Sequence, residues 1–593
     1  MSGRETEEYP QKTGERIGEK EISEAAAVLQ KYKRGKANLE KRIVENEEWW
    51  KLRRNVKSDT PRSAWLFNSI MGKHADFMDN YPAAVCLPRE QSDTQDAETL
   101  SEIIPVICER NEYKRIYSDA VWYKLKHGTA AYGVFWDSAL ENGLGDIAVR
   151  RIDLLNIFWQ PGITDIQDSK NLFIVSLADR EAMASAYPGI RMGDVINIAD
   201  YIYDDSIDNN DKTVVIDWYY KSRTEGGKTI LHYCKFCGST VLYASENDPT
   251  LRERGFYDHG MYPVVFDVLY PEEGTPYGFG IIDIGRDPQM YIDRLDAAVL
   301  DTIFDSANVR YFAKRGAGIN IDDFLDRSKK VVEVEGDISE ERLQRIEPPQ
   351  LPAGILDIKQ MKIDELKETT SNRDVSQGST SGGVTSGAAI ATLQEAGNKT
   401  SRDAIAGTHR AYEKIVCFII ELIRQFYTEA RSFRITGKLG FGYEFISYSN
   451  ANIVDQPTGV SPSGHETFRR PVFDIEVKAE KQNPFSTMTQ NETAVNLYQL
   501  GFFNPEMAGQ ALIALGMMSF EGKDEIVRKI SEQALTGAVM SPAESGSMAA
   551  SISAQNPISQ TQTRAAALGN YAAELARRAN PDMTERAQGA EPV

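Results

Sequence analysis

The sequence has few of the features that mark secreted, disulfide-stabilised or membrane-spanning proteins. Its 593 residues include only five cysteines, too few for a disulfide framework in so long a chain, so we expect a reducing compartment. Residues 1–20 are polar and contain no apolar run of the kind that directs secretion. The most apolar run, residues 415–423, includes Glu421 and is too short to span a bilayer. We therefore predict a buried helix there and no membrane segment.

An excess of basic residues is also lacking. The chain has 67 Lys and Arg against 87 Asp and Glu, a formal net charge of −20. Proteins that wrap nucleic acid hold its phosphates with clustered cations, so this balance argues against such a protein. It does not argue against a protein past which DNA slides. With 41% hydrophobic and 26% charged residues the chain is typical of globular proteins, and its length predicts several domains.

No motif for catalysis or nucleotide binding is present. A DNA-translocating NTPase would need a GxxxxGK[ST] loop, and the glycine-rich stretch 378–387 lacks the lysine. There is no HExxH cluster, and the six histidines are scattered along the chain. We therefore predict a protein that is not an enzyme and needs no cofactor.

One short stretch has the composition of a zinc knuckle. It contains His232, Cys234 and Cys237, and His259 is a further candidate ligand. A structural zinc usually takes a second cysteine pair, and the other cysteines of this chain are isolated. We therefore expect no metal here and interpret the two cysteines as small apolar residues of a hairpin. A zinc-containing nucleic-acid-binding protein remains an alternative.

Hydrophobic periodicity predicts an α+β fold in the first half of the chain. Helices are expected over Trp65–Tyr81, stopped by Pro82, and over Asp96–His127, broken at Pro105. Alternation of apolar and polar residues then predicts strands over Thr129–Asp137, Asp146–Phe158, Val214–Lys221, Thr229–Ser245 (a hairpin) and Tyr262–Leu269.

The central region has an unusual order of elements. Asp287-Pro288 predicts the start of a helix that runs to Ser306, because Asp caps free amides and Pro suits the first helical position. A small mixed segment over Asn308–Gln350, with a strand at Val331–Val334, precedes a second helix over Ile355–Thr370. Small uncharged residues follow and open into a helix predicted from Ala388 to Glu429, about 60 Å long.

The polar middle of this long helix, Glu395–His409, suits packing between identical subunits better than a monomer core. Two glycines in the helix, Gly397 and Gly407, are candidate kinks. Further strands are expected over Phe441–Ser449 and Pro471–Ala479, and helical structure over Asn483–Glu532.

The order of these elements resembles that of bacteriophage portal, or head-to-tail connector, proteins over most of residues 40–535. The stretches that carry the resemblance are Ala131–Asp137, Val149–Phe158, Tyr277–Ile282 and Ser376–Glu395. The resemblance implies a ring, usually a dodecamer, at one vertex of a capsid, through which double-stranded DNA is packaged and ejected. It implies as partners the terminase motor, the major capsid and scaffolding proteins and head-tail adaptors, with no membrane. Another non-enzymatic virion ring or adaptor protein is the alternative.

The resemblance also implies a division of the chain. The expected parts are an N-terminal arm (1–39), a wing (40–286 and 433–484), two stem helices (287–307 and 353–374), a clip (308–352), a tunnel loop (375–387), a long helix (388–432), a helical crown (485–535) and a flexible tail with a short helix (536–593). Location in the virion, after assembly in the host cytoplasm, follows from the same resemblance.

Two sets of side chains are the candidate DNA contacts. The stretch Val375–Ser386 has no charged residue, so its hydrogen bonds to DNA would be weak and replaceable. The expected DNA-facing side chains of this loop are Ser376, Gln377, Ser379, Thr380, Ser381 and Thr385. The candidate channel-lining basic residues are Lys359, Lys362 and Lys367, for which exposed solubilising charge is the alternative.

Overall fold

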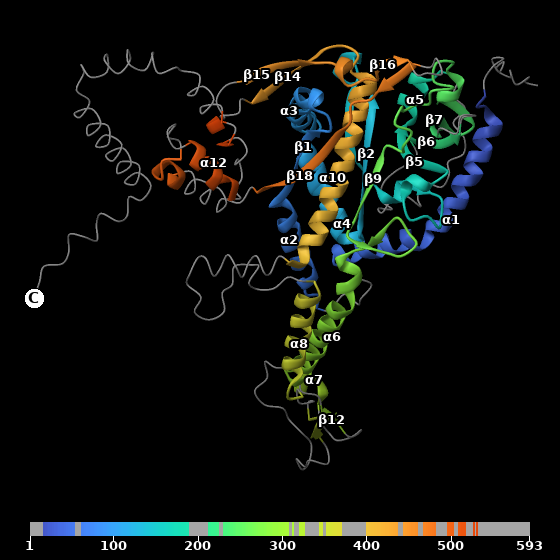
Figure 1. Ribbon diagram of the computed structural model, residues 1–593. Coiled ribbons are helices and arrows are strands. Elements are labelled where there is room, and N and C mark those ends of the chain that lie inside the picture. Colours follow the sequence, from blue (N-terminus) through green and yellow to red (C-terminus); the bar gives the residue numbers. More distant parts are fainter. Residues whose placement is uncertain are drawn as a thin grey trace, which may run out of the picture. The chain divides into compact units, whose positions relative to one another are not determined.

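The computed structural model describes residues 16–53, 61–188, 211–223, 229–307, 311–313, 320–326, 343–347, 352–370, 399–436, 443–460, 466–481, 495–502, 508–517, 526–527 and 529–531 (Figure 1). The chain divides into two compact units, Met1–Gln482 and Asn483–Val593. The first unit combines helices with antiparallel sheets, so its fold is α+β.

The helices alternate with the strands along the chain. They are α1 (Glu19–Trp50), α2 (Trp65–Met78), α3 (Thr94–Arg110), α4 (Tyr113–His127), α5 (Arg180–Ala186), α6 (Ile281–Ala307), α7 (Ile321–Leu325), α8 (Ile355–Thr369), α10 (Lys399–Phe426) and, in the second unit, α12 (Ala508–Met517). No helix in the described ranges has both the length and the apolar character needed to cross a bilayer.

Two sheets form the centre of the first unit. One has three strands in the order β3-β2-β9, made of Asp146–Ile152, Thr129–Asp137 and Val264–Val268. The other has five strands in sequence order: β4 (Ile157–Trp159), β5 (Asn171–Asp179), β6 (Lys212–Arg223), β7 (Thr229–Cys237) and β8 (Thr240–Ala244). The remaining pairs are β1-β18 (Asn80–Pro88, Phe473–Lys481), β10-β11 (Tyr270–Pro271, Gly278–Phe279), β12-β13 (Tyr311–Ala313, Leu343–Arg345), β14-β15 (Arg431–Thr436, Tyr443–Tyr448) and β16-β17 (Gln456–Val460, Glu466–Arg469).

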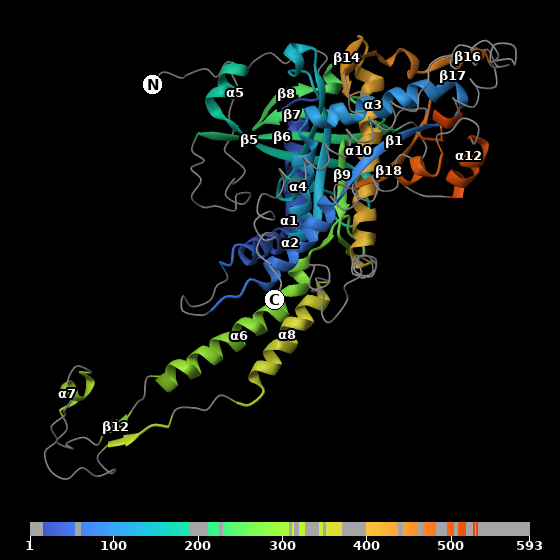
Figure 2. The same cartoon turned by 90° about the vertical axis from the view of Figure 1, so that its left-hand side faces the viewer.

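Helix α10 supplies much of the core beside the three-stranded sheet. Its apolar residues Ile415, Ile419 and Ile423 are fully buried, as the apolar run in the sequence predicts. The first half of α1 covers the five-stranded sheet, where Leu29 packs in one cluster with Phe173 and Trp218. Figures 1 and 2 show α10 and α4 running beside the three-stranded sheet.

Two helix boundaries predicted from proline are wrong. Pro105 lies inside α3, and the break comes instead at Glu112, whose φ of 52° is left-handed. Helix α6 begins at Ile281 rather than Asp287, so Pro288 lies inside it. At that earlier start Asp283 accepts a hydrogen bond from the Gly280 N–H at 2.7 Å. In both helices buried isoleucines extend across the proline, so the helix continues through it.

Two other boundaries differ from the predictions. Helix α2 ends at Met78, and the following residues form β1, which pairs with β18 some 390 residues later from Asn80↔Lys481 to Pro88↔Phe473. The expected strand Asp146–Phe158 is divided into β3 and β4 by a 3-10 turn at Leu154–Asn156. The hairpin around Cys237 is confirmed as β7 and β8.

Part of the predicted long helix lies outside the described residues, as do the strand at Val331–Val334 and the loop Val375–Ser386. The described helix α10 ends at Phe426, three residues before the predicted end. Gly407 lies within α10, where an added Cβ would be 3.7 Å from the Val268 carbonyl oxygen of β9. This is an ordinary van der Waals distance, so the approach of β9 does not by itself require a glycine here.

Gly128 joins α4 to β2 in a conformation that favours glycine. Its φ is +89°, and an added Cβ would lie 2.3 Å from the carbonyl carbon of Phe279. We expect Gly128→Ala to lower the free energy of unfolding by at least about 2 kcal/mol, because both backbone strain and a backbone clash oppose it. Urea unfolding followed by circular dichroism measures the loss. Gly143→Ala is the control, since its φ is +95° but no atom lies within 4 Å of the added Cβ. Equal losses in the two variants would contradict the clash.

Candidate functional site

Helices α6 and α8 form a pair that extends from the sheets of the first unit (Figure 2). Near its base, Ile292 of α6 and Ile363 and Leu366 of α8 form a small buried cluster, against which Trp65 packs. Further along, Lys359 forms an ion pair with Asp296 across the two helices. Beyond the far end of the pair lie α7 and the β12-β13 ladder (Figure 2).

Buried polar contacts fix the base of α6. Gln289 is fully buried, and its amide accepts the Leu66 N–H at 3.0 Å and donates to Ser63 Oγ at 2.8 Å. Asn46 of α1 donates to Asp283 Oδ1 at 3.0 Å. These buried hydrogen bonds give the helical pair a defined attachment to α1 and α2.

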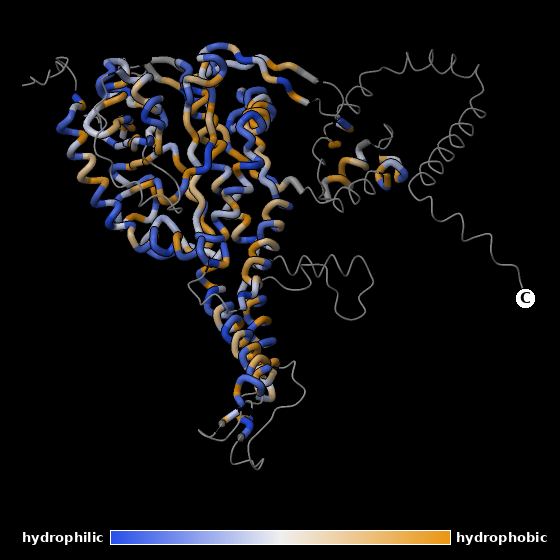
Figure 3. The backbone as a smooth tube through the Cα atoms, turned by 180° about the vertical axis from the view of Figure 1, so that it is seen from behind, coloured by the Kyte–Doolittle hydropathy of each residue, from blue (hydrophilic) through white to orange (hydrophobic). Residues whose placement is uncertain are grey.

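The outer part of the pair exposes large apolar side chains. Phe304 is 59% exposed and Met361 69% exposed. Other exposed apolar side chains on the two helices are Tyr291, Leu300, Ile303, Leu356 and Ile358. Figure 3 shows hydrophobic positions recurring along the pair. So many exposed apolar groups on two adjacent helices indicate a surface that another protein covers.

The two ends of segment 371–398 are bound to successive turns of α2. At one end Thr370 Oγ1 lies 3.1 Å from Ser69 Oγ. At the other, Lys73 Nζ donates to Ser401 Oγ at 2.7 Å, and Ser401 donates to Asp76 at 3.0 Å. Ser69 and Lys73 are four residues apart on one helix, so both ends of the segment lie at the base of the α6–α8 pair. The segment itself, with all six candidate loop residues, lies outside the described residues.

The polar middle of α10 has partners within its own chain. Lys124 Nζ of α4 donates to Asp267 Oδ1 of β9 at 2.6 Å and to Thr408 Oγ1 of α10 at 2.7 Å. Thr408 in turn donates to Asp267 Oδ2 at 2.9 Å. Burial lowers the pKa of Lys124, and the charge of Asp267 opposes that shift. The prediction that this stretch suits contacts between subunits better than a monomer core is therefore wrong at Ser401 and Thr408, both buried in the monomer.

The three candidate lysines of α8 all have neighbours of complementary chemistry. Lys359 pairs with Asp296, and Lys362 pairs with Glu365. Lys367 lies 5.6 Å from the ring centroid of Trp65, a cation–π distance. A lysine that is already paired has less free-energy gain from binding phosphate than an unpaired one. Their contact with DNA stays a prediction.

Comparison with known proteins assigns the chain to a family. A family model described as phage P22-like portal protein matches residues 74–582. The chain belongs to the phage P22-like portal protein family. A search of curated proteins found no match. Portal proteins are structural components of the virion capsid that form rings, so the match decides between the portal interpretation and another virion ring or adaptor.

The candidate zinc ligands of this portal family member lie in the five-stranded sheet and beside it. His232 Nδ1 is 3.2 Å from Ser245 Oγ, and Cys237 Sγ is 3.4 Å from Thr213 Oγ1. Cys234 packs in the core, and burial raises the pKa of its thiol to about 12. His259 lies outside the strands of the sheet and stacks on Tyr257. In the described ranges no three His, Cys, Asp or Glu side chains are grouped as a metal ion would require.

The residues that sequence reasoning missed are the polar anchors. Lys73, Ser401 and Gln289 lie on helices whose apolar spacing was recognised, but nothing in a single sequence shows which polar side chains meet across α2, α6 and α10. The one available signal was a polar residue at a core-facing position, as at Ser69 and Gln289.

Proposed function

We propose that this chain forms a dodecameric ring at one capsid vertex, through which double-stranded DNA is packaged and later ejected. The ring would be a passive channel without catalysis of its own, assembled in the host cytoplasm with scaffolding and major capsid proteins. The terminase motor would dock during packaging and head-tail adaptors afterwards. Membership of the portal family supports the ring and the virion location, and the lack of nucleotide-binding motifs in the sequence supports a separate motor.

We assign the parts of the chain as follows. The sheets and the helices around them, with residues 433–484, form the wing. Helices α6 and α8 form the stem, and β12, β13 and α7 belong to the clip. Segment 375–387 is the tunnel loop, which precedes the long helix. Residues 485–535 form the crown. The N-terminal arm and the C-terminal tail flank these parts.

The observation that carries the proposal is that Thr370 and Ser401, one on each side of segment 371–398, both bind to α2. This supports placing the tunnel loop at the base of the proposed stem. A loop with uncharged residues at this position can contact DNA in every copy without holding its phosphates.

The exposed apolar face of α6 and α8 supports the ring itself. Neighbouring copies placed side by side would cover Phe304, Met361 and the other exposed side chains of the stem. Full burial of a side chain of this kind contributes about 1.5–3 kcal/mol, so several per copy favour association.

Electron microscopy and mass determination test the proposal. The chain, produced together with its capsid and scaffolding proteins, should form rings whose central hole admits a DNA duplex, and capsids should carry one ring at one vertex. Capsids that fill with DNA in the absence of this chain would overturn the proposal.

Removal of the clip tests the docking assignment. Replacing Asn308–Gln350 by a short Gly/Ser linker should leave rings intact but abolish binding of both the motor and the adaptors, since the proposed docking residues are gone. Binding to immobilised rings measures the loss. A milder variant, Phe312→Ser with Leu325→Ser, changes two exposed apolar residues of this segment and should weaken docking by at least tenfold. Undiminished docking to the deleted ring would contradict the assignment.

A further inference from the structure

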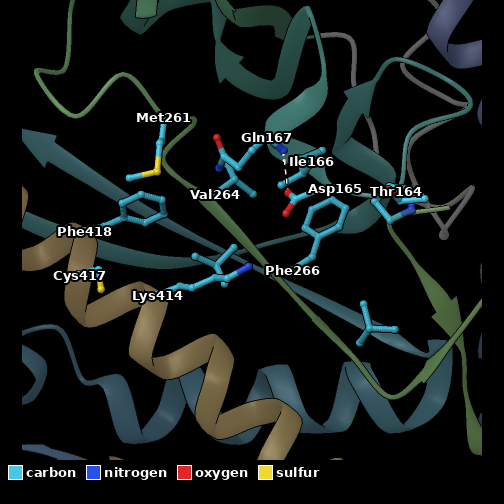
Figure 4. Close-up of a pocket in the computed structure, with 13 residues that line it drawn as sticks. Thr164, Asp165, Ile166, Gln167, Met261, Val264, Phe266, Lys414, Cys417 and Phe418 are labelled. Atoms are coloured by element: carbon cyan, nitrogen blue, oxygen red, sulfur yellow. Dashed lines mark hydrogen bonds between the residues drawn. The ribbon is translucent and has the colours of Figure 1, made fainter. Parts of the chain in front are cut away.

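A groove in the first unit runs along β9. Its volume is about 450 Å³, and it lies between α10 and the turn at residues 164–167 (Figure 4). Val264 and Phe266 of β9 contribute its apolar floor, and Phe418 of α10 contributes one wall. On the opposite wall Asp165 accepts the Gln167 N–H at 2.9 Å, which holds the turn in shape.

The groove has one charged residue on each wall, Lys414 on α10 and Asp165 on the turn opposite. The exposed side chain of Lys414 reaches from α10 toward β9 (Figure 4). Within the described part of the chain no hydrogen bond or ion pair is formed by its ammonium group. An apolar floor below an unpaired ammonium matches an occupant that combines apolar side chains with a carboxylate.

The same chain carries a protrusion with this chemistry. In the turn between β2 and β3, Leu140 is 39% exposed and Leu144 47% exposed. Between them Glu141 has φ of 49° and Asn142 of 56°, both in the left-handed region. Two successive left-handed residues other than glycine cost free energy, and such strain persists where the conformation serves a purpose.

The protrusion cannot fill the groove of its own chain. Arg431 donates to the carbonyl oxygens of Gly145 at 2.6 Å and Leu144 at 3.2 Å, which holds the turn beside the end of α10. Tyr427, 13 residues beyond Lys414, packs there against Trp136. At 1.5 Å per residue Tyr427 lies about 20 Å along the helix axis from Lys414 and about 13 Å from Phe418.

We propose that the groove receives the Leu140–Leu144 turn of the neighbouring copy in the ring, with Glu141 of that copy paired to Lys414. The inference rests on the proposed ring. A ring needs two different complementary surfaces on each copy, one for each neighbour, and the turn and the groove are such a pair. Lys414 attracts Glu141, which within its own chain lies 3.9 Å from Arg110, and the two leucines cover the apolar floor.

A charge exchange tests this contact in the full-length chain. Lys414→Glu and Glu141→Lys should each lower the fraction of chain found in rings, with association at least tenfold weaker, because each places like charges together. The double variant that carries both changes should recover ring formation. Mass photometry at fixed chain concentration measures the ring fraction, and circular dichroism with a thermal melt confirms that each variant is folded.

The controls repeat the charge changes elsewhere. Lys31→Glu on α1 and Glu181→Lys on α5 alter exposed residues outside both surfaces and should leave the ring fraction unchanged. A further variant, Leu144→Asp, should also weaken association, since it removes apolar contact.

The outcomes separate this contact from the proposed function. If wild-type rings form and the folded single variants assemble equally well, or the double variant does not recover, the contact is wrong while the ring proposal stands. If the wild-type chain forms no rings with its capsid partners, the proposed function fails and this contact with it.

Discussion

Asp267→Ala should unfold at a markedly lower urea concentration than the wild-type chain. The side chains of Lys124 and Asp267 are 0% and 1% exposed, and removal of the carboxylate leaves a buried ammonium without its charge partner. Breaking a buried pair in this way costs about 3–5 kcal/mol. The contact joins α4, β9 and α10, so the loss should spread through the whole first unit rather than stay local. Unfolding curves from tryptophan fluorescence measure it.

The matched control removes an aspartate from an exposed pair. Asp474 pairs with Arg89 on the surface, where both side chains are more than half exposed, and Asp474→Ala should change the unfolding midpoint little because solvent screens such pairs. A second variant, Lys124→Met with Asp267→Leu, should recover much of the lost stability, since it leaves no unpaired charge. If Asp267→Ala were as stable as wild type, the buried pair would not be holding α10 in place.

Ser379→Lys combined with Ser381→Lys should leave the ring intact and strongly reduce DNA packaging or ejection. The two changes add two positive charges per copy to Val375–Ser386, which has none. Each lysine that reaches a phosphate raises the barrier to sliding of the DNA. Packaged DNA length and phage titre measure the effect. Because salt weakens phosphate contacts, raised ionic strength should partly restore packaging in a purified system.

The neutral counterpart separates charge from size. Ser379→Gln with Ser381→Gln lengthens the same side chains without charge and should package DNA nearly as well as the wild type. Unchanged transport in the lysine variant, with rings of normal mass, would place these serines away from the DNA path.

Two interior prolines led to the wrong helix boundaries in α3 and α6. An interior proline costs a helix about 3 kcal/mol, which is why helix ends were predicted near Pro105 and Pro288. In α3, however, Ile103, Ile104 and Ile107 are all buried around the proline, and burial of each contributes about 1.5–3 kcal/mol. The packing outweighs the local cost, and a single sequence does not show that packing.

Strand β1 was missed for a related reason. Its prolines, Pro82 and Pro88, weaken any strand prediction because proline cannot donate to a ladder. Among the residues that the structure describes, β1 pairs on one side only, with β18, so its prolines are tolerated. That partner lies some 390 residues away in the chain, and local pattern carries no information about so distant a pairing.

The sequence by itself determined the α+β class, the limits of β2 and the portal resemblance that the family match supports. These follow from periodicity and from the order of elements, which are local properties. Only the tertiary structure decided that Thr370 and Ser401 are bound to the same helix, that Asp267 and Thr408 meet around Lys124, and that a groove lined by Lys414 lies beside β9. These contacts join residues from distant parts of the chain, whose meeting depends on how helices and sheets pack.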